Sequence, residues 1–294
     1  MLDADHVARF GFPRAVAALR AALERGLDPE TEPPRTSHRL GGGEVLVMPS
    51  SAGPVAGIKL VSVVPGNPGR GLPRIHGVYV LFDADTLKPR ALLDGAALTA
   101  LRTPAVSALG VELVAPADAR RLVVFGTGPQ ASGHVRALRA VRPLDSVRII
   151  GRDPSRRADL VRSLGPDAEA ADPSAVADAD IVACCTTART PLFPGELLAP
   201  HAVVVAVGSH EPDAREVDAE TVRRCGALVE SRSAATREAG DIIHALAEGA
   251  IGEDELVTFS DLVRGATPAR PRLIKTVGMG WEDLVIAAAV VDAA

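Results

Sequence analysis

A glycine-rich turn at residues 126–131 carries the spacing most typical of a chemical site in this sequence. The turn reads Gly126-Thr127-Gly128-Pro129-Gln130-Ala131. It follows an apolar run at residues 122–125, the pattern of a strand buried on both faces of a parallel sheet. After the turn, Val135, Leu138 and Val141 fall on one face of a helix. A G-x-G-x-x-A turn between a strand and a helix is typical of dinucleotide binding.

Each small residue of this turn has a physical reason to be there. Gly126 permits the tight turn, Gly128 lets the backbone approach a pyrophosphate, and Ala131 lets the helix pack close to the strand. The free N–H groups and the positive dipole end of the helix then face the phosphates. We therefore predict that Thr127, Pro129 and Gln130 also contact the cofactor.

The next strand, at residues 146–150, indicates which dinucleotide binds. An NAD enzyme usually carries Asp or Glu at the tip of this strand, where it binds the ribose 2′-hydroxyl. Here the tip is Gly151, followed by Arg152 and, one turn later, Arg156. Guanidinium groups bind phosphate bidentately, so the sequence favours NADP(H) over NAD(H). Two alternatives stay open: Asp153 could still reach a ribose, or the arginines could belong to a solvated helix start.

A second cofactor segment is expected where a strand at residues 180–184 ends. Cys185, Thr186 and Thr187 follow that strand, at the position where such folds line the nicotinamide ribose. We expect Cys184 and Cys185 to be packed small residues and not nucleophiles, because no partner histidine is evident nearby.

Composition excludes several classes of protein. The chain has 294 residues, 47% of them hydrophobic and 23% charged, as in an ordinary globular protein. A net charge of -5 provides no basic surface for nucleic acid or membranes. The three cysteines fit neither a disulfide framework nor a zinc site. The N-terminus lacks the basic start of a signal peptide, and no apolar run reaches the roughly 18 residues that span a bilayer. We expect a cytoplasmic protein without a metal.

The hydrophobic periodicity predicts an α/β protein of two domains. Up to residue 114 the pattern favours an antiparallel meander between two helices, with the elements at residues 12–26, 44–48, 55–64, 77–83, 90–93 and 96–113. From residue 115, strands and helices alternate, which predicts a Rossmann-type doubly wound parallel sheet. The apolar helix at residues 280–292 needs a partner surface and is expected to return to the first domain. The predicted domains are residues 1–114 plus 279–294 for substrate binding and dimerisation, and 115–278 for the dinucleotide.

The chain resembles the ornithine cyclodeaminase/mu-crystallin family over almost its full length. The matching segments include Pro34-Arg35-Thr, Met48-Pro49, Gly57-Ile-Lys59-Leu-Val, Leu98-Thr-Ala-Leu-Arg102-Thr103, Ala206-Val207-Gly208-Ser209 and Gly278-Met-Gly-Trp-Glu282-Asp283. The resemblance implies a homodimer built through the N-terminal β domain and an active site in the cleft facing the nicotinamide. It also implies cofactor contacts at Thr103, Val207, Gly208 and Ser209.

In this family a lysine and two arginines hold the substrate carboxylate, and the matching residues are Lys59, Arg102 and Arg35. Lys59 lies in an apolar run, and a buried ammonium needs an anionic partner. The alternative is an edge-strand lysine that reaches solvent. We expect Met48, His76 and the loop at residues 65–73 to contribute to substrate specificity.

Two departures from the cyclodeaminase pattern favour a different reaction. His210 stands where cyclodeaminases carry an aspartate, and Leu46 stands where they carry a glutamate that holds the side-chain amine. The sequence therefore resembles the imine reductases and amino-acid dehydrogenases of the family. We expect Lys59 to stabilise charge and supply a proton, and His210 to act as an acid/base or a helix cap. Asp213 and Glu216 are expected to organise a helix start.

The predicted activity is NAD(P)H-dependent reduction of a ketimine, a C=N bond alpha to a carboxylate, to an amino or imino acid. The alternatives are an alanine-type amino-acid dehydrogenase, then an ornithine cyclodeaminase, then a non-catalytic binding protein like the lens crystallin.

Overall fold

The computed structural model describes residues 1–265 and 271–294, and the chain divides into two compact units. The first unit comprises Met1–Arg102 and Met279–Ala294, and the second comprises Thr103–Gly278. The boundary lies inside helix α3 (Gly95–Val114), whereas the sequence placed it after residue 114. The reason is that α3 runs unbroken through the change from one unit to the other, so no loop marks the boundary.

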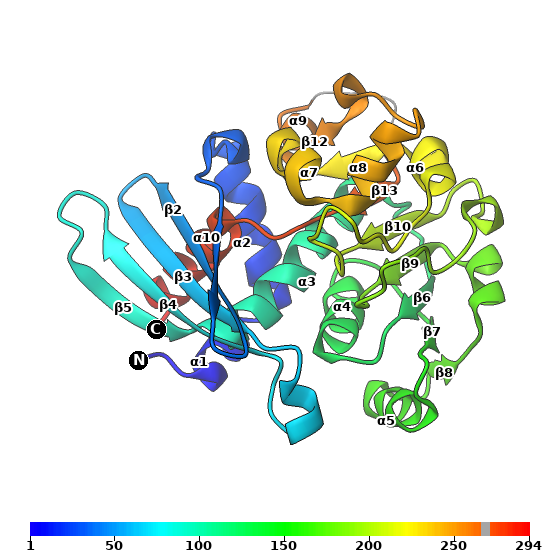
Figure 1. Ribbon diagram of the computed structural model, residues 1–294, viewed down its shortest axis with the longest axis horizontal. Helices are drawn as coiled ribbons and strands as arrows, with labels where there is room; N and C mark the ends of the chain where they lie inside the picture. The colour runs from blue at the N-terminus through cyan, green and yellow to red at the C-terminus, as the bar shows by residue number, and fades with distance from the viewer. Residues whose placement is uncertain (266–270) are drawn as a thin grey trace. The chain divides into compact units, whose positions relative to one another are not determined.

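The first unit is an antiparallel sheet with helices on one face (Figure 1). The strands follow the chain in order: β1 (Thr36–Leu40), β2 (Gly43–Ala52), β3 (Val55–Val63), β4 (Ile75–Asp83) and β5 (Pro89–Asp94). The helices are α1 (Ala4–Phe10), α2 (Phe12–Glu24) and α10 (Gly280–Asp292). The meander confirms the predicted architecture. The sequence missed β1, because all five of its residues are exposed and show no alternation of polarity.

The C-terminal helix α10 completes this first unit, as predicted. It packs against α2, β2 and β3 and buries Trp281, Leu284 and Ile286 completely. Gly280 permits the close approach, since a Cβ there would come within 2.6 Å of the Pro49 carbonyl oxygen. The helix therefore brings residues 281–283 to the buried face of the sheet.

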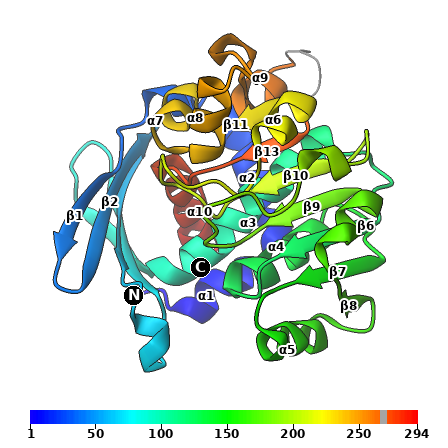
Figure 2. The same cartoon turned by 45° about the vertical axis from the view of Figure 1, so that its right-hand side comes forward.

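The second unit is the predicted doubly wound parallel sheet, and Figure 2 shows its strands from β11 to β8. That order is β12-β11-β13-β10-β9-β6-β7-β8. The strands are β6 (Arg121–Phe125), β7 (Ser146–Ile150), β8 (Ala168–Ala170), β9 (Ile181–Cys184), β10 (Val203–Ala206), β11 (Ala227–Val229), β12 (Val257–Thr258) and β13 (Leu273–Lys275). The helices are α4 (Pro129–Arg139), α5 (Pro154–Leu164), α6 (Ala219–Cys225), α7 (Arg232–Glu238), α8 (Gly240–Ala247) and α9 (Phe259–Val263). The order reverses at β6, and ligands bind such sheets at the carboxyl ends of the strands beside this switch point.

One helix of the second unit begins later than its sequence pattern indicates. The alternation of strands and helices after residue 115 predicts a helix at residues 214–224, but α6 begins at Ala219. Asp218 caps it, because its carboxylate accepts a 2.8 Å hydrogen bond from the Thr221 amide. Residues 211–218 are thereby left as turns, which changes the role of Glu216 described below.

Helix α3 is the one described helix that could cross a membrane by length and composition alone. Of its most apolar window, 67% is buried inside the protein. Buried core helices pass the same test, so this helix is weak evidence for a membrane segment.

Candidate active site

Strand β3 places Lys59 on the buried face of the antiparallel sheet. In the strand register Lys59 lies opposite Met48 on β2 and Tyr79 on β4, so the three side chains share one face. Lys59 is 1% exposed, and its Nζ lies 2.6 Å from Oδ2 of Asp283. The alternative of an edge-strand lysine in solvent is therefore wrong, because β3 is a central strand of the sheet.

Arg102 joins the same buried cluster from helix α3. Its Nη1 lies 2.7 Å from Oε2 of Glu282, and its Nε lies 3.6 Å from Oδ1 of Asp283. The cluster thus holds two cations and two carboxylates, with both acids completely buried. Sequence reasoning expected only a substrate carboxylate here and missed the two acids. The available signal was the adjacent Glu and Asp at the start of an apolar helix, since buried acids require cationic partners.

The environment of Lys59 brings its titration close to neutral pH. Burial lowers the pKa of Lys59 to about 8, with Asp283 opposing the shift and the Arg102 charge adding to it. An amine with a pKa in this range can both hold a positive charge and release a proton near neutral pH. Lys59 can therefore supply a proton near neutral pH.

An apolar wall adjoins Lys59 on the same face. Leu46, Met48, Val61 and Val63 form a buried cluster against which Ile75 packs. Leu46, at the position of the cyclodeaminase glutamate, belongs to this apolar cluster. Met48 lies opposite Lys59 in the strand register, and its contribution to specificity stays a prediction.

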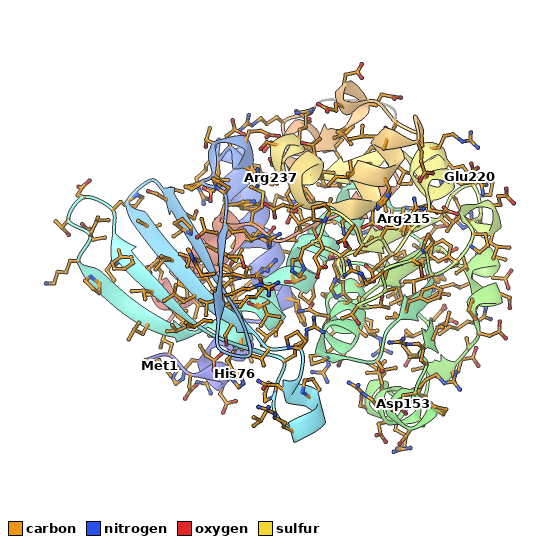
Figure 3. All side chains as sticks on the ribbon, viewed as in Figure 1. Met1, His76, Asp153, Arg215, Glu220 and Arg237 are labelled. Carbon is orange, nitrogen blue, oxygen red and sulfur yellow. The ribbon has the colours of Figure 1, made fainter. Side chains whose placement is uncertain are left out.

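His76 does not belong to this wall. It pairs with Ser62 in the register, and Ser62 and Lys59 point to opposite faces of β3 because they are three residues apart. His76 is exposed at the start of β4 (Figure 3). The strand register therefore does not support the expectation that His76 contributes to substrate specificity. Arg35 is partly exposed in the segment before β1.

A further acid that the sequence did not reveal lies beside this cluster. Burial raises the pKa of Glu32 to about 7, against the opposing effects of Ser50 and the Trp281 backbone.

Burial, together with the charges of Asp283 and Glu32, raises the pKa of Tyr79 far above its usual range. The Tyr79 hydroxyl occupies the space where a side chain on Gly57 would lie, so only glycine is accommodated there. Tyr79 OH and Trp281 Nε1 are buried without a hydrogen-bond partner among residues 1–265 and 271–294.

The glycine turn of the second unit has the geometry that a dinucleotide requires. Gly126 has φ +119°, and a Cβ there would collide with the Cys185 carbonyl oxygen. Gly128 caps helix α4, and a Cβ at Gly128 would meet no heavy atom within 4 Å. Ala131 is completely buried where α4 packs on the sheet. The open space above Gly128 and the free amides in the first turn of α4, which includes Gln130, fit a pyrophosphate.

The tip of β7 carries the two arginines that the sequence assigned to a 2′-phosphate. A Cβ at Gly151 would collide with the Thr127 side chain, so the turns after β6 and β7 meet at this glycine. Arg152 and Arg156 are exposed. Asp153 caps helix α5, accepting hydrogen bonds of 2.9 Å from the Ser155 amide and 3.1 Å from the Arg156 amide (Figure 3). The carboxylate of Asp153 is thus engaged in the cap, which weakens the alternative that it binds a ribose.

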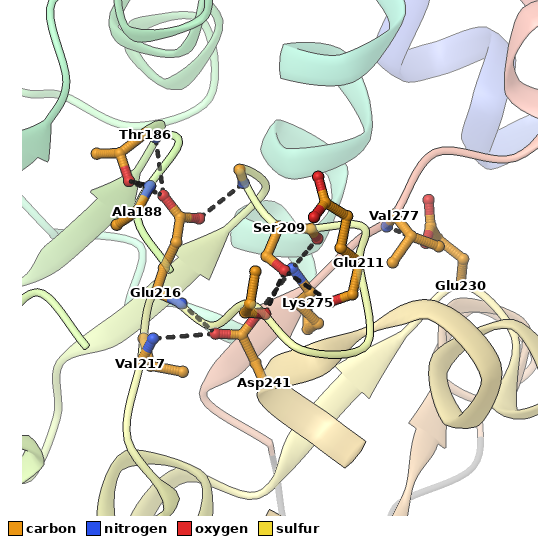
Figure 4. Close-up of polar contacts among 12 residues, drawn as sticks. Thr186, Ala188, Ser209, Glu211, Glu216, Val217, Glu230, Asp241, Lys275 and Val277 are labelled. Atoms are coloured by element: carbon orange, nitrogen blue, oxygen red, sulfur yellow. Dashed lines mark hydrogen bonds and ion pairs between the residues drawn. The ribbon is translucent and has the colours of Figure 1, made fainter. Parts of the chain in front are cut away.

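The loops after β9 and β10 contain the other residues predicted to contact the cofactor. Glu216 accepts hydrogen bonds from Thr186, as Figure 4 shows, and from the Gly208 amide. Glu216 therefore does not organise a helix start, and Asp213 instead pairs with Arg189 at the surface. Of the remaining predicted contacts, Ser209 is buried, Val207 and His210 are partly buried, and Thr187 is exposed.

The cysteines and the search for metal ligands add no further chemistry. Burial raises the pKa of both Cys184 and Cys185, so both thiols remain protonated at neutral pH. Within residues 1–265 and 271–294, no group of three or more His, Cys, Asp or Glu side chains could hold a metal ion. Thr103, which follows Arg102 on α3, is buried.

Together these features define a class of protein: an α/β protein with a dinucleotide-type glycine turn in one unit and a buried cluster of two cations and two carboxylates in the other. The chain belongs to the ornithine cyclodeaminase/mu-crystallin family, whose family model matches residues 12–294. This result confirms the predicted family and fold class.

Several similar proteins are imine reductases of that family, as predicted. Δ1-pyrroline-2-carboxylate reductase 2 of Burkholderia ambifaria is 39% identical over 83% of this chain and 78% of its own length. The Δ1-pyrroline-2-carboxylate/Δ1-piperideine-2-carboxylate reductase of Azospirillum brasilense is 36% identical over 96% of this chain and 91% of its own. The Thermococcus litoralis Δ1-pyrroline-2-carboxylate reductase, solved with NADH and L-proline, superposes with a TM-score of 0.91 at 27% identity. That superposition covers 99% of this chain and 96% of the other.

Proposed function

We propose that this protein is an NAD(P)H-dependent reductase of cyclic ketimines that carry a carboxylate on the imine carbon, of the Δ1-pyrroline-2-carboxylate type. The observation that carries the proposal is the buried Lys59 beside Arg102, placed against an apolar wall. Two cations beside an apolar wall suit a small ring with one anionic group and no second charged group. The similarity to reductases of this substrate class supports the same choice.

The residues of the first unit have distinct tasks in this reaction. Arg102 and Arg35 hold the substrate carboxylate, which keeps the imine carbon in a fixed orientation. Lys59, with a pKa of about 8, donates the proton that the nitrogen gains when the C=N bond becomes CH–NH. The apolar side chains of Leu46 and Met48 pack against the ring methylenes. When bound, the reduced nicotinamide supplies the hydride that the imine carbon accepts.

The same wall disfavours the rival reactions. A cyclodeaminase must hold the side-chain amine of a diamine, and the position that would do so is occupied by Leu46 within a buried apolar cluster. An amino-acid dehydrogenase of the alanine type stays the second candidate, because it uses the same carboxylate clamp and the same cofactor.

We also propose that NADPH is preferred over NADH. Arg152 and Arg156 are exposed beside the tip of β7, and the carboxylate of Asp153 is engaged in capping α5. The ratio of kcat/KM for the two cofactors tests this choice. Replacing Arg152 and Arg156 by alanine should reduce the preference for NADPH about tenfold or more, since each lost charged contact to phosphate is worth roughly 1.5–3 kcal/mol. An unchanged ratio in the double variant would remove the basis of the assignment.

We further propose a homodimer that forms through the outer face of the antiparallel sheet and acts in the cytoplasm. Leu60 and Leu92 are 37% and 44% exposed on that face, which lies opposite Lys59. Exposed apolar side chains grouped on one face are typical of subunit interfaces. Sedimentation equilibrium tests the dimer, and a Leu60→Asp/Leu92→Asp variant that sediments like the wild type would contradict the assigned face.

The activity is tested by following the absorbance of the reduced cofactor with Δ1-pyrroline-2-carboxylate, Δ1-piperideine-2-carboxylate, and pyruvate with ammonia. We expect rapid oxidation with the cyclic imines and loss of activity in Lys59→Ala. The matched control is Lys88→Ala, which changes an exposed lysine of the β4–β5 hairpin and should retain full activity. Release of ammonia from L-ornithine without net cofactor oxidation would instead identify a cyclodeaminase.

A further inference from the structure

Three charged side chains of the second unit are buried together, and the reaction described above does not use them (Figure 4). Glu216 is fully buried, and Asp241 and Lys275 are each 1% exposed. Burying charged groups is costly unless their hydrogen bonds are satisfied. Their positions therefore need an explanation other than packing.

Glu216 ties together two loops that leave neighbouring strands. Its Oε1 accepts hydrogen bonds from the Thr186 amide at 2.8 Å and the Thr186 hydroxyl at 2.7 Å, in the loop after β9. Its Oε2 accepts a 2.7 Å hydrogen bond from the Gly208 amide, in the loop after β10. The loops are in such close contact that a Cβ on Gly208 would collide with the Thr186 carbonyl oxygen.

Lys275 and Asp241 hold the next residues of the second loop. Lys275 is the last residue of β13, and its Nζ donates a 2.6 Å hydrogen bond to the Ser209 carbonyl oxygen. The same Nζ lies 2.9 Å from Oδ2 of Asp241 on α8. Oδ1 of Asp241 accepts hydrogen bonds from the Glu216 and Val217 amides at 2.7 and 2.9 Å. The charged atoms thus fix backbone at Thr186, Gly208 and Ser209, beside His210.

Both loops leave the carboxyl ends of adjacent strands, β9 and β10, and Lys275 lies at the carboxyl end of the next strand, β13. This is the edge at which a doubly wound sheet binds its dinucleotide. The glycine turn after β6 is the neighbouring loop on that edge, so the network lies on the nicotinamide side of the pyrophosphate turn.

We propose that Glu216, Asp241 and Lys275 are positioning residues that hold the Thr186 and Gly208–Ser209 backbone in the shape that receives the nicotinamide half of the cofactor. The proposal rests on the dinucleotide dependence of the proposed function. Glu216 acts on cofactor affinity, because it sets the spacing of two loops that line the ligand. The Lys275–Asp241 pair acts on the placement of His210, which follows Ser209 directly.

The chain contains a matched control for a purely structural role. Asp180 is also a buried carboxylate that ties neighbouring strands of the same sheet, accepting hydrogen bonds from the Arg120 and Arg121 amides at 2.8 and 2.9 Å. It does so at the amino ends of β6 and β9, the edge away from the dinucleotide site. Asp180→Asn and Glu216→Gln therefore make the same chemical change at opposite edges of one sheet.

The first measurement is the dissociation constant for NADPH, obtained by fluorescence titration without any imine. The side-chain amide of the Glu216→Gln variant would turn an N–H toward the donor of Thr186 or Gly208, so we expect NADPH binding to weaken about tenfold or more. Asp180→Asn should lower the thermal midpoint but leave the NADPH dissociation constant within about twofold of wild type. Equal weakening in both variants, or wild-type affinity in Glu216→Gln, would overturn the proposal. This readout stays valid even if no imine is reduced, so it is separate from the test of the proposed function.

A second variant tests the other arm of the network. Asp241→Asn can keep the hydrogen bonds from the Glu216 and Val217 amides while its amide group faces Lys275 and loses the ion pair. With an imine substrate and C4-deuterated NADPH, we expect a lower kcat, a larger deuterium isotope effect and an NADPH affinity within about threefold of wild type. A lowered thermal midpoint with an unchanged isotope effect would mean that the pair serves stability alone.

Discussion

At the scale of single residues, two opposing effects set the pKa of Lys59, and this pKa can be measured. Burial and Arg102 lower the pKa of Lys59, whereas Asp283 raises it, and the result is about 8. If the protonated amine is the active form, kcat/KM should be constant below this pKa and fall as the pH rises through it. Replacing Asp283 by Asn removes the charge that favours protonation, so the fall should occur at lower pH.

The measurement is the pH dependence of kcat/KM for the imine in wild type and Asp283→Asn. Because the variant also leaves a buried cation with a weaker partner, its thermal midpoint should decrease, and the profiles must be compared below that temperature. A descending limb that stays at the wild-type pH would show that Lys59 is not the titrating acid.

Glu32 makes a second prediction at this scale, on stability. Its pKa is raised to about 7 in the folded protein by burial, above the value of 4.5 for an ordinary glutamate. Folding therefore favours the protonated form of Glu32. The stability that this form contributes is present at pH 4 and is lost as the pH rises through 7. Glu32→Gln should consequently unfold at a higher temperature than wild type at pH 8, and the gain should disappear at pH 4. Calorimetry at both pH values measures this, and an equal difference at the two would contradict the assigned pKa.

Only two of the four residues in the buried cluster of Lys59, Arg102, Glu282 and Asp283 were recognised as site residues from the sequence. Lys59 and Arg102 could be recognised, because a cation in an apolar segment stands out and the family motif supports it. Their pairing with Asp283 and Glu282 could not be predicted, since these acids lie 224 and 180 positions away in the sequence. The sequence also did not show on which face of the antiparallel sheet His76 lies. That face depends on the register of His76 with Ser62, which the Pro65–Pro73 connection does not reveal.

At the scale of elements, the junction of α3 and α4 predicts a pH-dependent stability. His134 on α4 is completely buried, with Nε2 2.9 Å from the Ser107 hydroxyl on α3 and Nδ1 2.8 Å from the Gln130 carbonyl oxygen. Burial lowers the pKa of His134 to about 4, so the folded protein holds it neutral. As the pH falls from 6.5 to 4, the unfolded chain gains a proton that the folded chain resists. The resulting loss of stability reaches about 3 kcal/mol.

Replacing His134 by Gln removes this titration while keeping a polar side chain at the junction. We expect the variant to lose less stability than wild type between pH 7 and pH 4.5, whatever its stability at pH 7. Urea unfolding followed by circular dichroism at the two pH values gives the free energy of unfolding of each protein, and the difference between the two values is the loss to be compared. Parallel losses in wild type and variant would show that His134 is not the source.

Elements with a clear hydrophobic period were predicted well, and the others were not. Strands β2 to β4 contain apolar segments at strand spacing and β6 is apolar from Leu122 to Phe125, so their positions followed from the sequence. Strand β1 is exposed throughout, and its pairing with β2 depends on the two-residue turn between them. The start of α6 was set by the Asp218 cap, which the alternation of strands and helices does not locate.

At the scale of the whole molecule, the two units use different parts of the chain: the first is built from both ends and the second from the middle. The first unit is assembled from both ends of the chain, and its last segment supplies both acids of the substrate cluster. The second unit closes on a core of its own, formed by residues between Val123 and Leu273. The two-domain arrangement could be predicted from the change of period near residue 115. The boundary inside α3 could not, because a continuous helix carries no signal of it.

This arrangement predicts how a chain that ends at Gly278 should behave. The truncation removes Trp281, Leu284 and Ile286, which are fully buried and contribute roughly 1.5–3 kcal/mol each. It also leaves Lys59 and Arg102 buried without Asp283 and Glu282, at a cost of about 3–5 kcal/mol for a broken buried pair. The sum is comparable to the whole stability of a domain, about 5–15 kcal/mol, so the first unit should unfold. The second unit keeps every residue of its own core and of its glycine turn.

We therefore expect the truncated protein to lose imine reduction while still binding NADPH. Limited proteolysis should leave a resistant fragment that begins near Thr103, whereas the full chain should resist cleavage in both units. Fluorescence titration with NADPH measures the retained binding, and a Gly126→Val version of the truncated chain provides the negative control, because a side chain there collides with the Cys185 carbonyl oxygen. If the truncated chain still reduced the imine, α10 would not be needed to complete the site. If it bound no NADPH, the second unit would depend on the C-terminal helix in a way that its separate core does not indicate.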